Sequence, residues 1–332
     1  MRPDAAEETV GTTDSPGGRA WAGVAVLLLV TAIWGSTFPV VKVLTVDIPP
    51  AELLLLRFGI AGLLALPVLW WRWPGRIWLS PAMEFGLLGW LGSATQTEGL
   101  RFTSSGRSAF ITALSVLGVP LLATLLGRRQ PRRLWLAVAL ALAGAWLLVN
   151  DGGAPNRGDA LTLLTALSYS LYILRLEAWV QRMGAAQLMA AQTLGVLPFA
   201  ALAVWFSSGM AGTVPGASAA AALGGAAGLA GWLEGLARGW AAWPMEHWLA
   251  LVYLGTIGLG LTAALQAIGQ ARVSGARAAL LFTTEPVWAA GFAWLWLGEV
   301  LGPAGLLGAG LILGAAWWGQ GLSLEALRQG PD

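Results

Sequence analysis

The stretch LGSATQTEGLRFTSSGRSA at residues 91–109 recurs 170 positions later as LTAALQAIGQARVSGARAA at residues 261–279, with seven of 19 aligned positions identical. A second pair, TAIWGS at 31–36 and TALSYS at 165–170, aligns at an offset of 134. The offsets differ by 36 residues (170 − 134 = 36), which indicates an insertion in the second half. The Gly/Ala-rich segment at about 208–244 is where we place it. The sequence therefore predicts an internal duplication of one structural unit, an arrangement typical of transporters with a site between their halves.

The composition predicts a membrane protein. Hydrophobic residues make up 57% of the chain, charged residues 11%, and the mean hydropathy is +0.68, whereas about a quarter of the residues of soluble proteins carry charge. The pI near 9.5 reflects a net charge of only +2, and the arginines lie in short loops between apolar runs, which argues against nucleic acid as a partner. The chain has no cysteine and only His247, so we expect neither a metal site nor a disulfide.

Apolar runs of about 20 residues, the length that crosses a hydrocarbon core of about 30 Å, occur ten times. We therefore expect an all-α integral membrane protein with ten transmembrane helices. The expected spans are residues 21–43, 51–71, 79–100, 106–127, 133–150, 158–180, 186–207, 245–269, 277–297 and 301–320.

The expected organisation is two five-helix repeats between tails. Residues 1–20 are polar, lack the basic start of a signal peptide, and are expected to form a disordered cytoplasmic tail. The first repeat takes residues 21–150 and the second residues 157–320, followed by a cytoplasmic tail at 321–332. The insertion at 208–244 forms either an interfacial helix or an eleventh span, and its glycines and charges favour the interfacial helix.

The distribution of Lys and Arg sets the orientation. With a cytoplasmic N-terminus, 13 of the 19 basic residues fall on the cytoplasmic side, five fall on the other side, and Arg57 lies within the second span. This bias obeys the positive-inside rule and predicts that both termini are cytoplasmic. Because five spans are an odd number, the second repeat enters from the opposite side, so the repeats are expected to be inverted.

The motifs resemble the drug/metabolite transporter superfamily, specifically its ten-helix EamA-type permeases. In the first half the matching segments are AIWGSTFPVVK (32–42), LLLLRF (53–58) and QTEGLRFTSSGRSAFITAL (96–114). In the second half they are GDALTLLTALSYSLYI (158–173) and LQAIGQARVSGARAALLFTTEPVWAAGFAWLWLGE (265–299). The resemblance implies movement of small organic solutes across a cytoplasmic membrane, often export, with varied substrates. We expect no cofactor.

Glu285 is the strongest candidate for a role in transport. It lies about 12 Å inside the ninth span, where a carboxylate costs roughly 2.5–3.5 kcal/mol and therefore tends to face a cavity or a partner. Pro286 removes a backbone donor beside it. Glu285 either exchanges a proton for substrate in a kinked, hydrated site or merely hydrogen-bonds to the kink.

Five polar residues near the repeated stretch are further candidates. Glu98 either binds solute or forms an interfacial ion pair with Arg101. Gln96 and Gln266 are repeat-equivalent amides, expected near opposite membrane faces, that either contact substrate or join helices. Arg107 and Arg277 are equivalent residues at helix mouths, where they anchor the helices or act in gating.

Aromatic and hydroxyl side chains complete the candidate set. Trp34, Tyr169 and Tyr172 suit a cavity that stacks a ring, although Trp and Tyr also populate membrane interfaces. Thr112 and Thr283 lie in helices that line the family's central pathway, as the resemblance implies. Small residues, including Gly118 and Gly291, are expected to let helices approach closely.

Other classes of protein fit the sequence less well. There is no His/Glu metal motif, paired Asp run or Walker loop, so we expect no enzyme. A scaffold or sensor explains neither an inverted duplication nor Glu285, and a channel differs from a carrier only in its flux. We expect alternating access in a bacterial-type inner membrane, possible proton coupling being the weaker addition, with uncoupled facilitated exchange as the alternative.

Overall fold

The structure is a computed structural model that describes residues 16–71, 75–149, 154–211, 226–297 and 302–319. Every regular element in these ranges is a helix, and they contain no strand. The expectation of an all-helical protein is therefore confirmed for the described part of the chain.

The first half of the chain forms six α-helices and one short 3-10 helix. They are α1 (Pro16–Asp47), α2 (Pro50–Trp71), η1 (Gly75–Trp78), α3 (Leu79–Gly99), α4 (Ser105–Ala113), α5 (Ser115–Leu125) and α6 (Arg132–Val149). The second half has shorter pieces. They are α7 (Arg157–Trp179), α8 (Ala185–Leu194), α9 (Leu197–Ala211), α11 (Ala226–Ala241), α12 (Met245–Tyr253), the π-helical η2 (Leu254–Leu261), α13 (Thr262–Gln270), α14 (Gly275–Phe282), α15 (Glu285–Leu297) and α16 (Pro303–Gly319).

Each expected apolar range holds a helix or a run of consecutive helices. Five of these are both long and apolar enough to cross a membrane. They are Ala20–Asp47, Pro50–Trp71, Arg107–Leu125, Ala185–Ser207 and Met245–Gln270. The other expected ranges are helical in their described residues but shorter or less apolar.

Two helices break at positions related by the repeat offset. The first break is at Leu114, between α4 and α5, and the second is at Thr283 and Thr284, between α14 and α15. At each break a backbone N–H bonds three residues back, from Leu114 to the Ile111 carbonyl and from Thr284 to the Leu281 carbonyl. Since 114 + 170 = 284, the break is repeated along with the sequence. The kink that we expected at Glu285 is thus a break directly before that residue.

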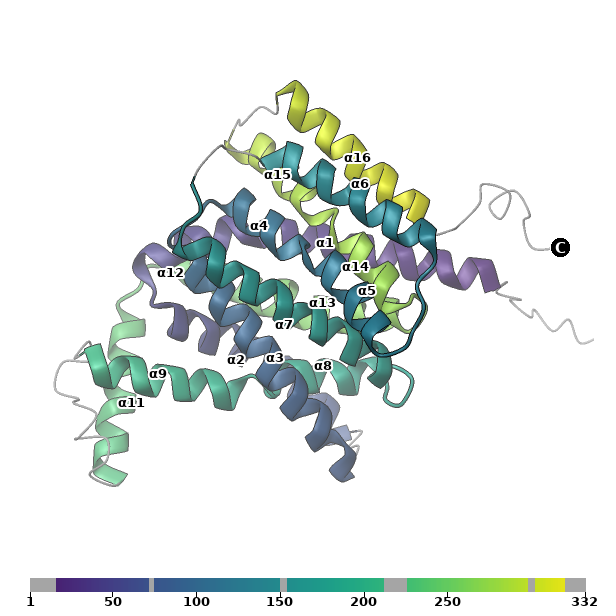
Figure 1. Ribbon diagram of the computed structural model, residues 1–332. Helices are drawn as coiled ribbons and strands as arrows, with labels where there is room; N and C mark the ends of the chain where they lie inside the picture. Colours follow the sequence, from purple (N-terminus) through teal and green to yellow (C-terminus); the bar gives the residue numbers. More distant parts are fainter. Residues whose placement is uncertain (1–15, 72–74, 150–153, 212–225, 298–301, 320–332) are drawn as a thin grey trace, which may run out of the picture.

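The two halves pack into one body. The helix α6 lies along α16, and α3 lies along α7, so each pair joins one half to the other (Figure 1). Close approach depends on glycine at the α6–α16 crossing and where α3 meets the residues between α8 and α9. A Cβ on Gly144 would lie 2.7 Å from the Gly308 carbonyl oxygen, and one on Gly86 would lie 2.2 Å from the Gly195 carbonyl oxygen. These backbones touch because no side chain separates them.

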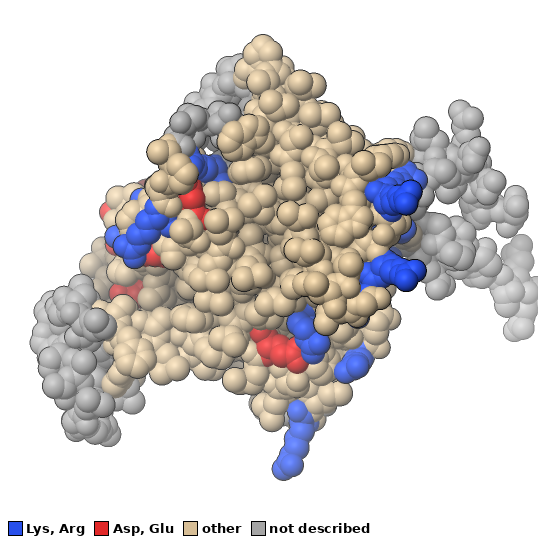
Figure 2. All heavy atoms as spheres, in the orientation of Figure 1, with Lys and Arg blue, Asp and Glu red and all other residues tan. Residues whose placement is uncertain are grey.

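The surface is apolar between two charged ends. On the face in Figure 2, Lys, Arg, Asp and Glu gather at two separated regions, with uncharged surface between them. Large apolar side chains stand exposed on several helices, for example Leu63, Trp146 and Leu313. A broad exposed apolar band rimmed by charge is what a lipid-facing surface requires.

The insertion and the N-terminal tail differ in detail from their expected ranges. The helix α1 begins at Pro16, so residues 16–20 are helical rather than part of a tail. Residues 1–15 and the expected tail at 321–332 lie outside the described residues. Of the insertion, residues 208–211 continue α9, and α11 lies across α9 in Figure 1. The helix α11 has 16 described residues, a length of about 24 Å, and its interfacial placement stays a prediction.

Candidate functional site

A cavity of about 140 Å³ lies between the two halves of the chain. Its wall includes residues of α1, α2, α3 and α4 from the first half and of α7, α8, η2, α13 and α15 from the second. Its polar and charged lining residues are Thr37, Arg57, Ser93, Gln96, Thr112, Ser115, Tyr169, Tyr172, Gln192, Thr193, Thr262, Gln266 and Glu285. Trp34, Phe38, Phe58 and Phe282 contribute rings, so the cavity is apolar with distributed polar groups, as small-molecule sites usually are.

Most of the residues that the sequence singled out reach this cavity. The predicted residues that line it are Trp34, Gln96, Thr112, Tyr169, Tyr172, Gln266 and Glu285. Gln96 and Gln266, which we expected near opposite membrane faces, both reach the same cavity from α3 and α13.

Glu285 stands at the first position of α15, directly after the break. Its side chain is partly exposed because it faces the cavity. The described residues provide no hydrogen bond or ion pair to its carboxylate. The backbone at this point is fixed against α1, because a Cβ on Gly35 would lie 3.0 Å from the Glu285 carbonyl oxygen and 2.7 Å from the Trp288 Cβ. The helix break thus presents an unpaired carboxylate to the cavity.

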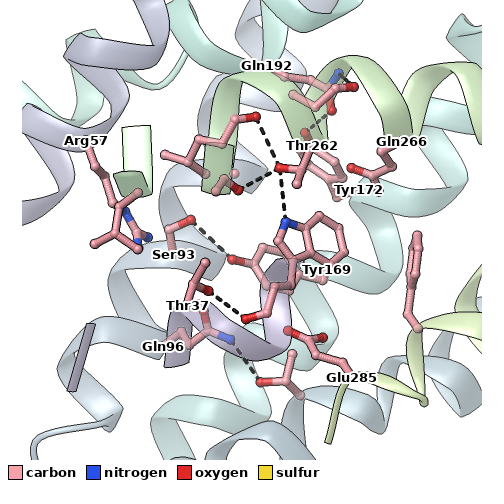
Figure 3. Close-up of a pocket in the computed structure, with 18 of the residues that line it drawn as sticks. Thr37, Arg57, Ser93, Gln96, Tyr169, Tyr172, Gln192, Thr262, Gln266 and Glu285 are labelled. Atoms are coloured by element: carbon pink, nitrogen blue, oxygen red, sulfur yellow. Dashed lines mark hydrogen bonds between the residues drawn. The ribbon is translucent and has the colours of Figure 1, made fainter. Parts of the chain in front are cut away.

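The aromatic side chains of the cavity are held by hydrogen bonds between helices (Figure 3). The Trp34 indole Nε1 donates to the Thr262 hydroxyl at 3.2 Å, and its ring centroid lies 5.3 Å from that of Phe282. The hydroxyls of Tyr169 and Ser93 are 3.2 Å apart.

Two further bonds fix amides in the cavity wall. The Tyr172 hydroxyl donates to Gln192 Oε1, and Gln96 Nε2 donates to the Thr112 hydroxyl at 3.2 Å. Each of these two bonds joins helices of the same half, whereas the Trp34–Thr262 and Ser93–Tyr169 bonds cross from one half to the other. A movement between the halves would therefore disturb the crossing bonds and change the cavity lining.

Four predicted residues, Glu98, Thr283, Arg277 and Arg107, do not line the cavity. Glu98 forms an ion pair with Arg101 at 3.3 Å near the end of α3, which is the alternative that the sequence left open. The Thr283 hydroxyl donates to the Leu280 carbonyl oxygen at 2.6 Å inside the helix break. Arg277 is exposed in the first turn of α14.

Arg107 joins the two halves outside the cavity. Its Nη2 lies 2.7 Å from Asp159 Oδ2, and the two side chains are 17% and 10% exposed. Asp159 also accepts hydrogen bonds from the Thr103 hydroxyl at 3.1 Å and from the Asn156 N–H at 2.9 Å, in the capping box of α7. The carboxylate therefore ties the start of α7 to α4.

The other end of α7 carries two further ion pairs. Arg175 Nε lies 2.6 Å from Glu84 Oε2 on α3, and Arg128 Nη1 lies 3.1 Å from Glu177 Oε2. Asp159 and Arg175 are 16 residues apart, a rise of about 24 Å along the helix. Charged contacts thus lie at both ends of α7, with Tyr169 between them.

Sequence reasoning missed several cavity residues. Arg57 was noted as a charge within a span, and the cost argument that singled out Glu285 applies to it equally. Ser93, Gln192 and Thr262 gave no signal, because small polar residues in apolar runs usually only bond within or between helices.

The described residues offer no cluster that would hold a metal ion. His247 Nε2 lies 3.4 Å from Asp47 Oδ2, and no other histidine exists. The ionisable side chains that line the cavity are those of Arg57, Tyr169, Tyr172 and Glu285.

Comparison with known proteins places this site in context. An uncharacterized transporter of Archaeoglobus fulgidus is 35% identical over 149 residues, which cover 44% of this chain and 46% of that protein. The uncharacterized transporter YdfC of Bacillus subtilis is 25% identical over 297 residues, or 86% of this chain and 87% of YdfC. The uncharacterized inner membrane transporter YedA of Escherichia coli K12 is 30% identical over 171 residues, which cover 48% of this chain and 56% of YedA. The chain thus spans about half the length of the archaeal protein and of YedA.

A solved structure titled "Crystal structure of protein" superposes with a TM-score of 0.66 at 20% identity, covering 95% of this chain and 100% of that one, which shows a shared fold. The EamA-like transporter family matches residues 21–150 and 222–318, more than half of the chain. The resemblance inferred from the motifs is confirmed, and the chain belongs to the EamA-like transporter family.

Proposed function

We propose that this membrane transporter exports small organic solutes, of the metabolite, amino acid or drug class, across the cytoplasmic membrane by alternating access. The observation that carries the proposal is the cavity between the halves, with Glu285 unpaired in its wall. A site between two halves that can rock against each other is the arrangement that alternating access needs.

The moving parts are two inverted five-helix repeats, at 21–150 and 157–320. The repeated helix break at Leu114 and Thr284, and the two equivalent amides Gln96 and Gln266 in one cavity, support this arrangement. A pseudo-two-fold axis in the membrane plane brings such equivalent positions together near the midplane.

Both termini lie in the cytoplasm, and the membrane is the inner membrane, as for YedA. The excess of basic residues on one side of the spans supports this orientation. It puts the Arg107–Asp159 pair on the outer side and the Glu84–Arg175 pair on the cytoplasmic side. We propose that these contacts are the gates, which break and form in alternation.

Glu285 couples a proton to the solute. An ionised carboxylate in an apolar cavity is costly without a counter-charge, so it is neutralised either by a proton or by a group of the solute. Exchange of one for the other ties proton movement to solute movement. The carboxylate stands directly after the helix break, at the first position of α15.

Reconstitution in liposomes that hold a pH dye tests the proposal. A panel of amino acids, purines and amphipathic drugs is screened for solute-dependent proton flux with the wild-type protein and with Glu285→Gln. We expect flux in the wild type, loss of proton flux in Glu285→Gln, and normal flux in Glu98→Gln, whose carboxylate lies outside the cavity. Solute uptake without proton movement, unchanged by Glu285→Gln, would refute the coupling, and no solute movement would refute transport.

A further inference from the structure

Arg57 is a buried cation without an anionic partner. It lies in the middle of α2, its side chain lines the cavity, and the residue is 7% exposed. Its Nε is buried without a hydrogen-bond partner, and no ion pair or hydrogen bond of its guanidinium occurs within the described ranges. Figure 3 shows Arg57 on the opposite side of Tyr169 from Glu285 in that view.

This state of Arg57 is costly unless something completes it. A guanidinium cannot lose its charge in a protein, and an arginine in a membrane-spanning helix usually finds a counter-charge or water. The contact that the structure gives it is the ring of Phe58, 5.6 Å from the guanidinium carbon. A cation–π contact supplies neither hydrogen-bond acceptors for the guanidinium N–H groups nor a negative charge to balance Arg57. The free donors therefore face the cavity.

We propose that Arg57 binds an anionic, planar group of the transported solute, and that the solute is a small organic carboxylic acid. This inference rests on the proposed function and names the class of its substrate. The fork of the guanidinium matches a carboxylate through two parallel hydrogen bonds. The rings of Trp34 and Phe282 supply an apolar wall for the rest of the solute.

The cavity also limits the size and the charge of the solute. Its volume of about 140 Å³ is similar to that of an engineered cavity that holds one benzene molecule, so the solute is about the size of one ring. Arg57 and Glu285 line the same cavity without forming an ion pair. A simple carboxylate balances the charge of Arg57 while Glu285 is protonated. An acid that also carries an ammonium group balances the charges of both Arg57 and ionised Glu285.

Two matched sets of small solutes test the inference by isothermal titration calorimetry on the purified protein in detergent. One set is benzoate, benzamide, benzylamine and phenylglycine, and the other is pentanoate, pentanamide, pentylamine and 2-aminopentanoate. We expect members with a carboxylate to bind the wild type and the amides and amines to bind far more weakly. Equal binding of amides or amines, or no binding of any carboxylate at millimolar concentration, would overturn the inference without any variant.

Variants then locate the recognition. Arg57→Gln is expected to weaken the carboxylates by about 30-fold or more, as when one partner of a buried charge pair is removed. Arg57→Lys keeps the charge but loses the two parallel hydrogen bonds, so its affinity for carboxylates should lie between those of the wild type and Arg57→Gln. Arg182 packs over Trp179 away from the cavity, so Arg182→Gln should bind carboxylates like the wild type. Unchanged carboxylate binding in folded Arg57→Gln would mean that Arg57 only balances Glu285, and the inference would fail.

The outcomes separate this inference from the proposed function. Carboxylates that bind through Arg57 but are never moved in liposomes would leave the inference standing and remove the transport proposal. Movement of solutes as amides, with no preference for acids, would leave transport standing and remove the role of Arg57.

Discussion

Breaking the Arg107–Asp159 pair should open the outer side of the cavity. The carboxylate of Asp159 accepts three hydrogen bonds, from Arg107, Thr103 and the Asn156 backbone, and is 10% exposed. Asp159→Asn keeps the shape but removes the charge. A hydrogen bond to a charged group contributes about 1.5–3 kcal/mol, against about 0.5–1.5 kcal/mol for a neutral one. Summed over the bond to Arg107 and the smaller changes at the bonds to Thr103 and Asn156, the substitution weakens the closed contact by about 2 kcal/mol. That energy shifts the ratio of outer-open to outer-closed molecules by about 30-fold.

The lack of cysteine in the chain provides the assay. A single Ser115→Cys places a thiol in the cavity wall. Its reaction with a membrane-impermeant maleimide, added outside right-side-out vesicles, reports how often the outer side is open. In the Asp159→Asn background we expect the labelling rate to rise by up to about 30-fold, the shift in the open fraction.

Two control variants make the labelling result specific. Glu234→Gln removes an ion pair with Arg238 whose side chains are 69% and 79% exposed, and such pairs contribute almost nothing. It should leave the rate unchanged. Glu84→Gln loosens the cytoplasmic end and should raise labelling from that side instead. An outside rate in Asp159→Asn equal to that in Glu234→Gln would refute the role of this pair as a gate.

Two further predictions concern packing. Gly86→Ala should lower the melting temperature in detergent by several degrees, because its Cβ would lie 2.2 Å from the Gly195 carbonyl oxygen and overpacking costs about 1–3 kcal/mol. Gly291 has open space around it, so Gly291→Ala should leave the melting temperature unchanged. Equal melting temperatures of the two variants would contradict the close contact at Gly86. Trp240→Phe removes the hydrogen bond from its Nε1 to Glu52 at 2.6 Å, so amide exchange along α11 should quicken by about tenfold or more, and unchanged exchange would show that α11 is held by other contacts.

Long apolar runs made the helices predictable, but not all of their interruptions. Glu285 and Pro286 indicated the break at Thr284, whereas the break at Leu114 lies in a largely apolar run with no charge or proline directly beside it. The π-helical segment η2 also lies in such a run. It contains a close approach to α2, since a Cβ on Gly255 would lie 2.6 Å from the Ile60 Cβ and 2.8 Å from the Arg57 carbonyl oxygen. Glycine permits that contact, yet the sequence does not tell which glycines are used. Gly118 lies in a close helix contact, because its Cβ would meet the Ser170 hydroxyl, whereas Gly291 lies in no such contact.

Helical geometry explains which candidate residues reach the cavity. Tyr169 and Tyr172 are three residues apart and share a face of α7, so both line it. Gln96 and Glu98 are two residues apart, about 200° around the helix, so only one can. The sequence offered both, because periodicity gives relative directions and does not tell which face meets the cavity. The tertiary contacts of α3 with α7 decide in favour of Gln96.

The helix α7 connects the two proposed gates with the proposed binding site. Its first turn is tied to α4 by Asp159, its last turns are tied to α3 by Arg175, and Tyr169 lines the cavity between them. Since the helix is continuous and its N-terminus is fixed by a capping box, we expect it to move as a rod in the proposed mechanism. A rod that leaves its partner at one end while keeping the other must tilt about a point between them. Tyr169 places the cavity near that point, so in the proposed mechanism a small tilt would expose the solute to one side of the membrane while the contact at the far end kept the other side closed.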